Sequence, residues 1–372
     1  MRPSASTMRL VLILIATLVL SSPAWLMLIV AETASGRLAG LLPCVVFLVP
    51  ALLLAARTYP RARWVALALS GVAIAIVVVL LVRAPDGRAL DANAPRSTFL
   101  TGQQFDRWNV PNVVPEIDQI KYGTYLVPFV DPFIDWRQSV RLREVSMAVY
   151  RPMEADPSYR ALGSVMSSAY RDVDVGHVFE YVPPHEKDER LPTLIFLHGS
   201  AGNFKVYFHL WRTVADAARV ILVCPSFGFG NWNRPEGLTT IDRTVQHVLN
   251  DLPSDPDRLV LAGLSNGGRG VTRAMALHPS RYAGAVLISA VMEPIVVDAP
   301  PLPGAYLGKP VLVLHGAKDR RIPLVYAESG AQLYRDHDAR VTMRVYEDED
   351  HFLFFSKSSE VLGQVTGWLE AL

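Results

Sequence analysis

The sequence predicts an α/β domain with a mostly parallel central sheet, preceded by three transmembrane helices. Near the N-terminus lie three uncharged apolar runs, each about as long as a helix that crosses a bilayer. From about residue 141 to residue 372, short apolar runs alternate with longer helical stretches. That alternation is typical of parallel strands with helices on both faces of the sheet.

The composition excludes several classes of protein. The 372-residue chain has 36 basic and 35 acidic residues, a formal net charge of +1. Nucleic-acid binding usually needs a concentrated basic face, so it is not expected. The two cysteines, Cys44 and Cys224, lie in separate apolar runs. Zinc sites and disulfide frameworks need more cysteines at closer spacing, so we expect two buried structural cysteines and no metal site.

A membrane anchor is predicted over residues 1–83. The apolar runs cover residues 10–31, 38–56 and 64–82 and contain no charged residue. Because charge inside a bilayer is costly, its absence favours three membrane-spanning helices. A channel or transporter is an alternative, but runs without charge offer no path for an ion, so an anchor is the simpler interpretation.

The first run has a second interpretation, a cleaved signal peptide. Ser22, Pro23 and Ala24 are small residues at a spacing suited to cleavage after Ala24. The apolar stretch continues to residue 31, which is longer than a signal core needs, and this favours an uncleaved span.

Basic residues between the runs predict the orientation of the chain. The second loop carries Arg57, Arg61 and Arg63 and no acid, whereas the first loop has only Arg37, next to Glu32. Because positive loops stay in the cytoplasm, the N-terminus and the second loop are expected inside. Everything after residue 83 is then expected to be extracytoplasmic, in a multi-pass membrane protein.

Residues 84–140 lack a sustained period. The first part, up to residue 98, is rich in Ala, Pro and Asp, which predicts a linker. Residues 99–140 are rich in aromatics and proline, and we expect irregular structure that packs over a domain. A lid over a pocket remains an alternative for this segment.

Elements of a catalytic domain are predicted over residues 141–372. Most of its strands are continuous Val, Ile and Leu runs, as expected when helices cover both faces, and the first strand partly alternates. The expected strands are 145–152, 176–184, 191–199, 219–227, 257–265, 282–290, 310–319 and 341–350. The expected helices are 204–218, 239–251, 267–278, 324–337 and 358–371.

A serine between glycines follows one of these strands. Gly263, Leu264, Ser265, Asn266 and Gly267 fit the pattern G-x-S-x-G. A strand that turns sharply into a helix strains its corner residue, and side chains two positions away on either side would collide there. Ser265 is therefore a candidate nucleophile at the carboxyl end of the sheet. The alternative is a tight turn whose serine only caps the helix.

A serine hydroxyl needs a base before it can attack. Asp319 and His351 each follow one of the last two strands, which gives the order Ser, Asp, His expected for this arrangement. His351 is predicted to take the proton of Ser265, and Asp319 to orient the imidazole. Acids also crowd His351 at 347–350, but immediate neighbours seldom point at the ring, so Asp319 is preferred.

Donors for an oxyanion are predicted on two loops. One is the backbone N–H of Asn266, after the nucleophile, and the other comes from the loop at 198–202. Ser200 is the first choice on that loop and Ala201 the second. His198 is interpreted as a residue that braces the loop, because His351 is better placed to act as the base.

The loop at 225–237 is rich in glycine and aromatic residues. It should lie at the same sheet edge, where ligands of open α/β folds bind. Phe227, Phe229 and Trp232 are candidates to line a substrate pocket, and simple packing is the equal alternative.

These motifs resemble the α/β-hydrolase superfamily over roughly residues 145–372. The resemblance is carried by HGSAG, GLSNGG, HGAKDRRIP and EDEDHF in that order, and is nearest to the dienelactone-hydrolase and prolyl-oligopeptidase-like group with its polyester-depolymerase-like members. It implies an α/β-hydrolase fold and a serine hydrolase that acts on small-molecule esters, or less often peptides, without a cofactor. The upstream β-propeller of the oligopeptidases has no counterpart here.

Two classes of function remain open after the sequence alone. The first is an enzyme, a carboxylic ester hydrolase with a serine peptidase as the alternative. The second is a catalytically silent hydrolase-like module that binds a partner or small molecule, although every catalytic position appears filled. These features make no prediction of the oligomeric state.

Overall fold

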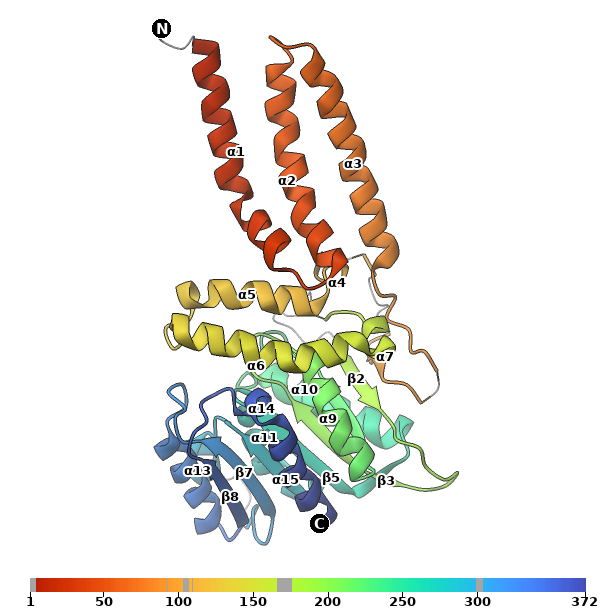
Figure 1. The fold of residues 1–372 in the computed structure, drawn as a ribbon. Helices are drawn as coiled ribbons and strands as arrows, with labels where there is room; N and C mark the ends of the chain where they lie inside the picture. Colours follow the sequence, from red (N-terminus) through yellow and green to blue (C-terminus); the bar gives the residue numbers. More distant parts are fainter. Residues whose placement is uncertain (1–4, 92, 103–106, 109, 166–175, 299–303) are drawn as a thin grey trace. The chain divides into compact units, whose positions relative to one another are not determined.

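The computed structural model describes residues 5–91, 93–102, 107–108, 110–165, 176–298 and 304–372. The chain forms two compact units (Figure 1). The first unit contains residues 1–84 and 107–143, and the second contains residues 85–106 and 144–372.

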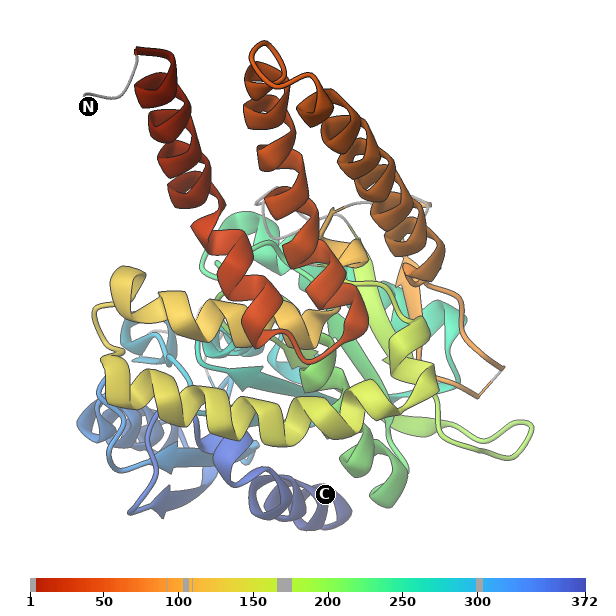
Figure 2. The ribbon, with the colours of Figure 1, turned by 45° about the horizontal axis from the view of Figure 1, so that its top comes forward.

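Three long helices dominate the first unit: α1 (Ala5–Val30), α2 (Ala34–Ala55) and α3 (Arg61–Arg83). Each packs against the next in the chain, and Figures 1 and 2 show them joined by short turns. All three are long and apolar enough to cross a membrane. These helices are rich in Leu, Val, Ile and Ala, and they correspond to the three apolar runs that were predicted to be helical from the sequence.

The segment 99–140 is largely helical, and the expectation of irregular structure was wrong. It contains α4 (Val110–Val113), α5 (Glu116–Val130) and the first part of α6 (Trp136–Ala155). Acidic residues stabilise the first turn of a helix, and α5 has Glu116 and Asp118 there. The start signals of α5 were present in the sequence, but the scattered aromatic residues hid its period.

The strand expected at 145–152 is also wrong, since these residues lie within α6. Alternating Val145, Met147 and Val149 suggested a strand. The deeply buried residues Met147, Tyr150 and Met153 instead recur every three positions, as on one face of a helix.

An eight-stranded sheet forms the centre of the second unit, in the order β1-β2-β4-β3-β5-β6-β7-β8. Strands β1 and β2, and β2 and β4, pair antiparallel, and all other pairs are parallel. The strands are β1 (Arg96–Phe99), β2 (His177–Tyr181), β3 (Leu191–Leu197), β4 (Ile221–Pro225), β5 (Ser254–Leu264), β6 (Gly284–Ile288), β7 (Pro310–Gly316) and β8 (Arg340–Tyr346).

Strand β1 lies in the segment that was expected to be a linker. It pairs with β2 from Arg96 opposite Glu180 to Phe99 opposite His177. All four of its residues are only partly buried, so the strand carries no apolar run that could have revealed it in the sequence.

Helices cover both faces of the sheet. On one face, α9 (Lys205–Ala217) and α15 (Ser358–Glu370) pack together, and Trp211 of α9 lies 5.2 Å from Phe196 of β3 between ring centroids. On the other face, Ile195 and Leu197 join a core with the helices α10, α11, α12 and α13. Adjacent strand residues point to opposite faces, so one apolar strand serves two cores.

The remaining helices include the other three predicted from the sequence and four short ones that were not predicted. Their bounds are α7 (Pro157–Ala161), α10 (Pro235–Asp251), α11 (Gly267–Leu277), η1 (Pro279–Arg281), α12 (Pro294–Asp298), α13 (Leu324–Asp336) and α14 (Leu353–Ser356). All five predicted helices are confirmed. Helix α10 begins earlier than expected, at Pro235, because proline is well tolerated in the first turn of a helix.

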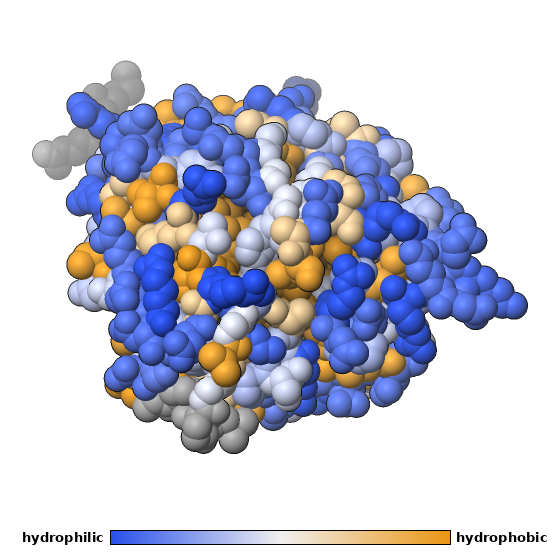
Figure 3. Space-filling view, turned by 90° about the horizontal axis from the view of Figure 1, so that it is seen from below, coloured by the Kyte–Doolittle hydropathy of each residue, from blue (hydrophilic) through white to orange (hydrophobic). Residues whose placement is uncertain are grey.

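One face of the molecule is shown in Figure 3. Hydrophilic residues cover most of it, with smaller apolar patches among them. This mixture is ordinary for protein surface in contact with water.

Two tyrosines of α13 allow a test of the core. Tyr334 is fully buried, with its ring 4.9 Å from that of Tyr306, whereas Tyr326 is 65% exposed. We expect Tyr334→Ala to lower the free energy of unfolding by about 3–5 kcal/mol, as for other buried aromatic residues. The matched Tyr326→Ala should change it little. Thermal unfolding of the detergent-solubilised chain measures both, and equal effects would contradict this packing.

Candidate active site

The corner between β5 and α11 is strained at Ser265. Its φ angle is 51°, a left-handed conformation that residues other than glycine rarely adopt. Two backbone hydrogen bonds hold it there: the N–H of Ser265 donates to the carbonyl of Ile288 at 3.1 Å, and the N–H of Val291 donates to the carbonyl of Ser265 at 2.9 Å. The end of β6 therefore fixes the serine.

The glycines around Ser265 have steric reasons. A Cβ atom on Gly263 would lie 2.7 Å from the backbone carbon of Gly267. One on Gly267 would lie 2.0 Å from the carbonyl oxygen of Leu197, and one on Gly268 would lie 2.6 Å from that of Val291. Backbone atoms cannot move aside as a flexible side chain can. The collisions predicted from the sequence two positions either side of the serine are confirmed.

Three side chains predicted from distant parts of the sequence meet at this corner. Nε2 of His351 lies 3.1 Å from Oγ of Ser265, and Nδ1 of His351 lies 2.7 Å from Oδ2 of Asp319. The register explains the meeting. Gly263 pairs with Leu287, and β6 and β7 continue that register to β8, so the parallel strands end at one edge.

Asp319 is held as a carboxylate beside the imidazole. Burial alone disfavours its charge, but the hydrogen bond and charge of His351 and the N–H of Ile322 outweigh burial, so the pKa of Asp319 lies below its usual value. Its Oδ1 accepts from the N–H groups of Arg321 and Ile322, both at 2.9 Å. Oδ2 is thereby left facing His351.

His315 is a structural partner of this turn that the sequence analysis missed. It is fully buried, and its Nε2 donates to the carbonyl of Ile322 at 2.9 Å. Burial lowers the pKa of His315, which keeps it neutral. The only sequence signal was its place in HGAKD, four residues before Asp319.

Acids adjacent to His351 in the sequence make other contacts. Asp348 pairs with Lys318 at 2.8 Å, and Glu349 accepts from the hydroxyl of Ser356. Asp350 accepts from the N–H of Phe352 at 2.9 Å. The preference for Asp319 as the partner of the imidazole agrees with this geometry.

The loop after β3 approaches the serine directly. A Cβ atom on Gly199 would lie 3.3 Å from the carbonyl oxygen of Leu264 and 3.4 Å from Cβ of Ser265, so the loop passes in contact with the serine corner. Within the described residues, the N–H groups of Ser200 and Asn266 donate to no backbone carbonyl. The N–H of Ala201 donates to the carbonyl of Phe229 at 3.0 Å, so Ala201, the second choice for an oxyanion donor, is already engaged.

His198 braces this loop, as the sequence analysis expected. It is fully buried, and Nδ1 donates to the carbonyl of Gly199 at 2.8 Å while Nε2 accepts from the N–H of Phe227 at 3.1 Å. Burial lowers the pKa of His198 to about 4. A neutral ring that both donates and accepts joins the two loops near the serine.

Only one of the three aromatic candidates for a substrate pocket is accessible. Phe227 and Trp232 are 1% and 0% exposed, and Nε1 of Trp232 donates to the carbonyl of His198 at 2.8 Å. Both pack within the core, which corrects their proposed role as pocket lining. Phe229 is 40% exposed and remains a candidate. Burial could not be read from the loop because its residues follow no period.

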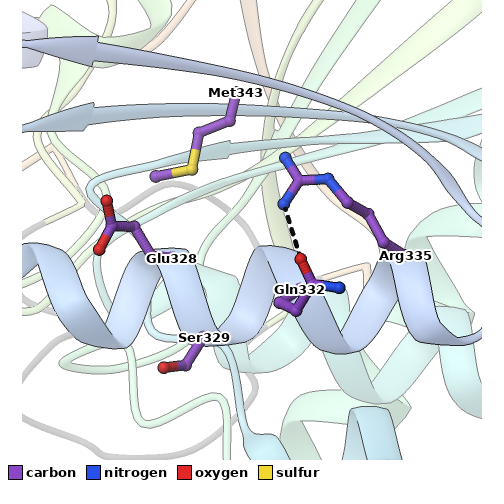
Figure 4. A pocket seen from close by; sticks show the side chains of 5 residues that line it. All are labelled: Glu328, Ser329, Gln332, Arg335 and Met343. Atoms are coloured by element: carbon purple, nitrogen blue, oxygen red, sulfur yellow. Dashed lines mark hydrogen bonds between the residues drawn. The ribbon is translucent and has the colours of Figure 1, made fainter.

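A hollow of about 510 Å³ lies along α13 and β8 (Figure 4). Met343 extends from β8 toward α13, where Arg335 donates to Gln332 at 3.4 Å, and Glu328 and Ser329 complete the lining. It contains none of the predicted site residues. No group of three His, Cys, Asp or Glu residues in the described part of the chain is placed to hold a metal ion.

The strand order, the antiparallel β2 and the serine corner after β5 define the α/β-hydrolase fold. The predicted fold class is thus confirmed. No family model matches the chain, and no curated protein is similar to it in sequence.

Solved structures that resemble the chain do so at low sequence identity. One is a hyperthermophilic esterase from the archaeon Pyrobaculum calidifontis, at 16% identity and a TM-score of 0.44 over 63% of this chain and 96% of that one. A putative dienelactone hydrolase from Klebsiella pneumoniae is 18% identical, at 0.43 over 52% and 92%. A thermostable esterase is 17% identical, at 0.43, and this chain covers 58% of its length.

Two glycines allow a test of the serine corner. Gly267→Ala would place a methyl group against the carbonyl of Leu197, whereas nothing lies within 4 Å of a Cβ on Gly363 in α15. We expect Gly267→Ala to lower the melting temperature of the chain. Gly363→Ala should be neutral or stabilise the chain by up to about 1 kcal/mol. An unchanged melting temperature in Gly267→Ala would contradict the close approach described above.

Proposed function

We propose that the chain is a membrane-anchored serine hydrolase that cleaves carboxylic esters through a covalent acyl-enzyme. The observation that supports this most strongly is the continuous hydrogen-bonded series from Ser265 through His351 to Asp319, at 3.1 and 2.7 Å. A neutral imidazole whose second nitrogen is fixed by a carboxylate is the arrangement that activates a serine hydroxyl.

In the proposed first step, Oγ of Ser265 attacks the ester carbonyl carbon while Nε2 of His351 accepts the hydroxyl proton. The carbon–oxygen bond to the alcohol then breaks, and Nε2 returns the proton to the departing alkoxide. Asp319 stabilises the imidazolium and keeps its Nδ1–H in place without itself taking the proton. Water repeats the sequence on the acyl-enzyme, which releases the acid and restores Ser265.

The tetrahedral intermediates carry a negative oxygen that needs donors. The N–H groups of Asn266 and Ser200 are proposed for this role, since neither donates to a backbone carbonyl in the described part of the chain and Gly199 brings that loop against Ser265. Loss of one such donor raises the barrier by about 3–4 kcal/mol in comparable sites. Ala201 is not available as an oxyanion donor, because its N–H donates to the carbonyl of Phe229.

The membrane assignment is proposed from α1, α2 and α3, whose length and composition suit a bilayer. The basic loop with Arg57, Arg61 and Arg63 favours a cytoplasmic position for the turn between α2 and α3. The proposed catalytic domain is then extracytoplasmic, with a small-molecule ester as its substrate.

The proposed nucleophile is tested with Ser265→Ala. We expect turnover of a p-nitrophenyl butyrate substrate to fall by about 10⁴-fold or more, as for other triad serines, with an unchanged melting temperature. Ser329→Ala, on the exposed surface of α13, is the control. A chromogenic peptide assay separates esterase from peptidase.

Labelling by a fluorophosphonate probe adds a readout that is independent of substrate choice. The wild-type chain should be labelled and Ser265→Ala should not. Retained turnover in the alanine variant would refute the nucleophile. An unlabelled, inactive wild-type chain would favour the silent binding module.

The proposed orientation is tested with two single cysteines. Lys187, in the exposed loop after β2, is replaced by Cys for one chain, and Tyr59, 63% exposed between α2 and α3, for the other. A membrane-impermeant maleimide should label Lys187→Cys in intact cells and Tyr59→Cys only after permeabilisation. The opposite pattern would overturn the orientation while leaving the anchor intact.

A further inference from the structure

In the first unit, α5 and the first part of α6 form a helical hairpin that ends in an exposed apolar tip. We define the apolar tip by its exposed residues, Leu126, Phe129, Val130, Phe133, Trp136 and Val140, whose exposed fractions run from 38% to 78%. A cluster of this size on an exposed turn marks a surface that meets another apolar phase or partner.

The hairpin is held in shape by its own contacts. The rings of Phe129 and Trp136 meet edge to face at 5.2 Å between centroids. The guanidinium of Arg143 lies 3.9 Å from the ring centroid of Tyr125, and the hydroxyl of Ser139 donates to the carbonyl of Thr124. The apolar tip is therefore a preformed surface.

The base of the hairpin is tied to one end of the three long helices. Oδ1 of Asp118, in the first turn of α5, accepts from the N–H groups of Glu32 and Thr33 at 2.5 and 3.2 Å, between α1 and α2. Lys121 pairs with Glu32 at 2.6 Å. The side chain of Arg107 donates to the carbonyls at the end of α3. Helix α5 starts where all three apolar segments reach the same side.

We infer that the apolar tip lies in the boundary between lipid headgroups and acyl chains of the membrane that α1–α3 span. This inference rests on the proposed membrane anchor. If the three helices cross a bilayer, the ends of α1–α3 that lie next to α5 are at the membrane surface. Figure 1 shows that α5 runs crosswise to the axes of the three helices at these ends. A hairpin in that place, with Phe129 of α5 and Trp136 of α6 exposed, matches the composition of interfacial segments, which bury about 5–10 Å deep.

We favour lipid over a protein partner because the apolar tip and the proposed membrane helices are parts of the same unit. The apolar tip belongs to the same compact unit as the helices that would contact lipid, so the bilayer is already beside it. The tip also contains aromatic rings beside its aliphatic residues. Such rings, Trp136 in particular, are favoured at the depth of the lipid headgroups.

The test uses three cysteine variants of the full chain, each labelled with a fluorophore sensitive to polarity. Phe133→Cys reports the apolar tip, Val46→Cys the middle of α2, and Lys187→Cys a water-exposed loop. The native Cys44 and Cys224 are 3% and 0% exposed, so the unmodified chain serves as the labelling blank. Each variant is reconstituted in phosphatidylcholine vesicles that carry a spin-label quencher either near the headgroup or at mid-chain.

We expect the label at residue 133 to emit at shorter wavelength than the label at residue 187, and to lose more fluorescence to the shallow quencher than to the deep one. The label at residue 46 should show the reverse depth preference. If the label at residue 46 is quenched and the label at residue 133 is not, the inference is wrong and the membrane anchor is supported. This holds whether or not a protein partner or a second copy of the chain shields the tip. Absence of quenching at both positions would overturn the anchor and the inference together.

Discussion

The structure of the candidate site depends on one strained residue, Ser265. Its left-handed backbone is held by two hydrogen bonds, one to the carbonyl of Ile288 at the end of β6 and one from the N–H of Val291 in the segment after β6. Strain of this kind costs about 1–3 kcal/mol and persists where the surroundings determine it fully. Because Gly263 and Gly267 have no side chain, neighbouring backbone atoms can approach them closely around the serine. The hydroxyl position is thus determined by the sheet itself.

Histidines in this part of the chain have two kinds of environment, buried and partly exposed. His198 and His177 are buried, and burial lowers their pKa values to about 4 and about 3. Such rings stay neutral and serve as fixed hydrogen-bonding groups. His351 remains partly exposed at 16% of its side chain, between a carboxylate and a hydroxyl. This access and this charged neighbour suit the proposed role of His351 as a general base.

Sequence reasoning predicted the parts of the site that strand ends determine. Ser265, Asp319 and His351 each follow an apolar run, and parallel strands bring such positions to one edge. It failed where burial or backbone bonding decides. The engagement of Ala201 with Phe229, the burial of Trp232 and the bracing role of His315 depend on loops that have no period. It also failed at α6, where a few alternating residues concealed a helical repeat that was visible only over a longer window.

The route of the chain determines where it could be shortened if the proposed membrane helices α1–α3 were removed. It leaves the first unit after residue 84, contributes β1 to the sheet, and returns at residue 107. Deleting everything up to residue 143 would discard β1 and expose the edge of β2. Glu180, 3% exposed, would lose Thr98 and Arg96, which contact its Oε1 at 2.7 and 3.0 Å. A bare strand edge promotes aggregation, and a buried carboxylate that loses partners destabilises the fold, so a shortened chain should retain the strand from residues 96–99.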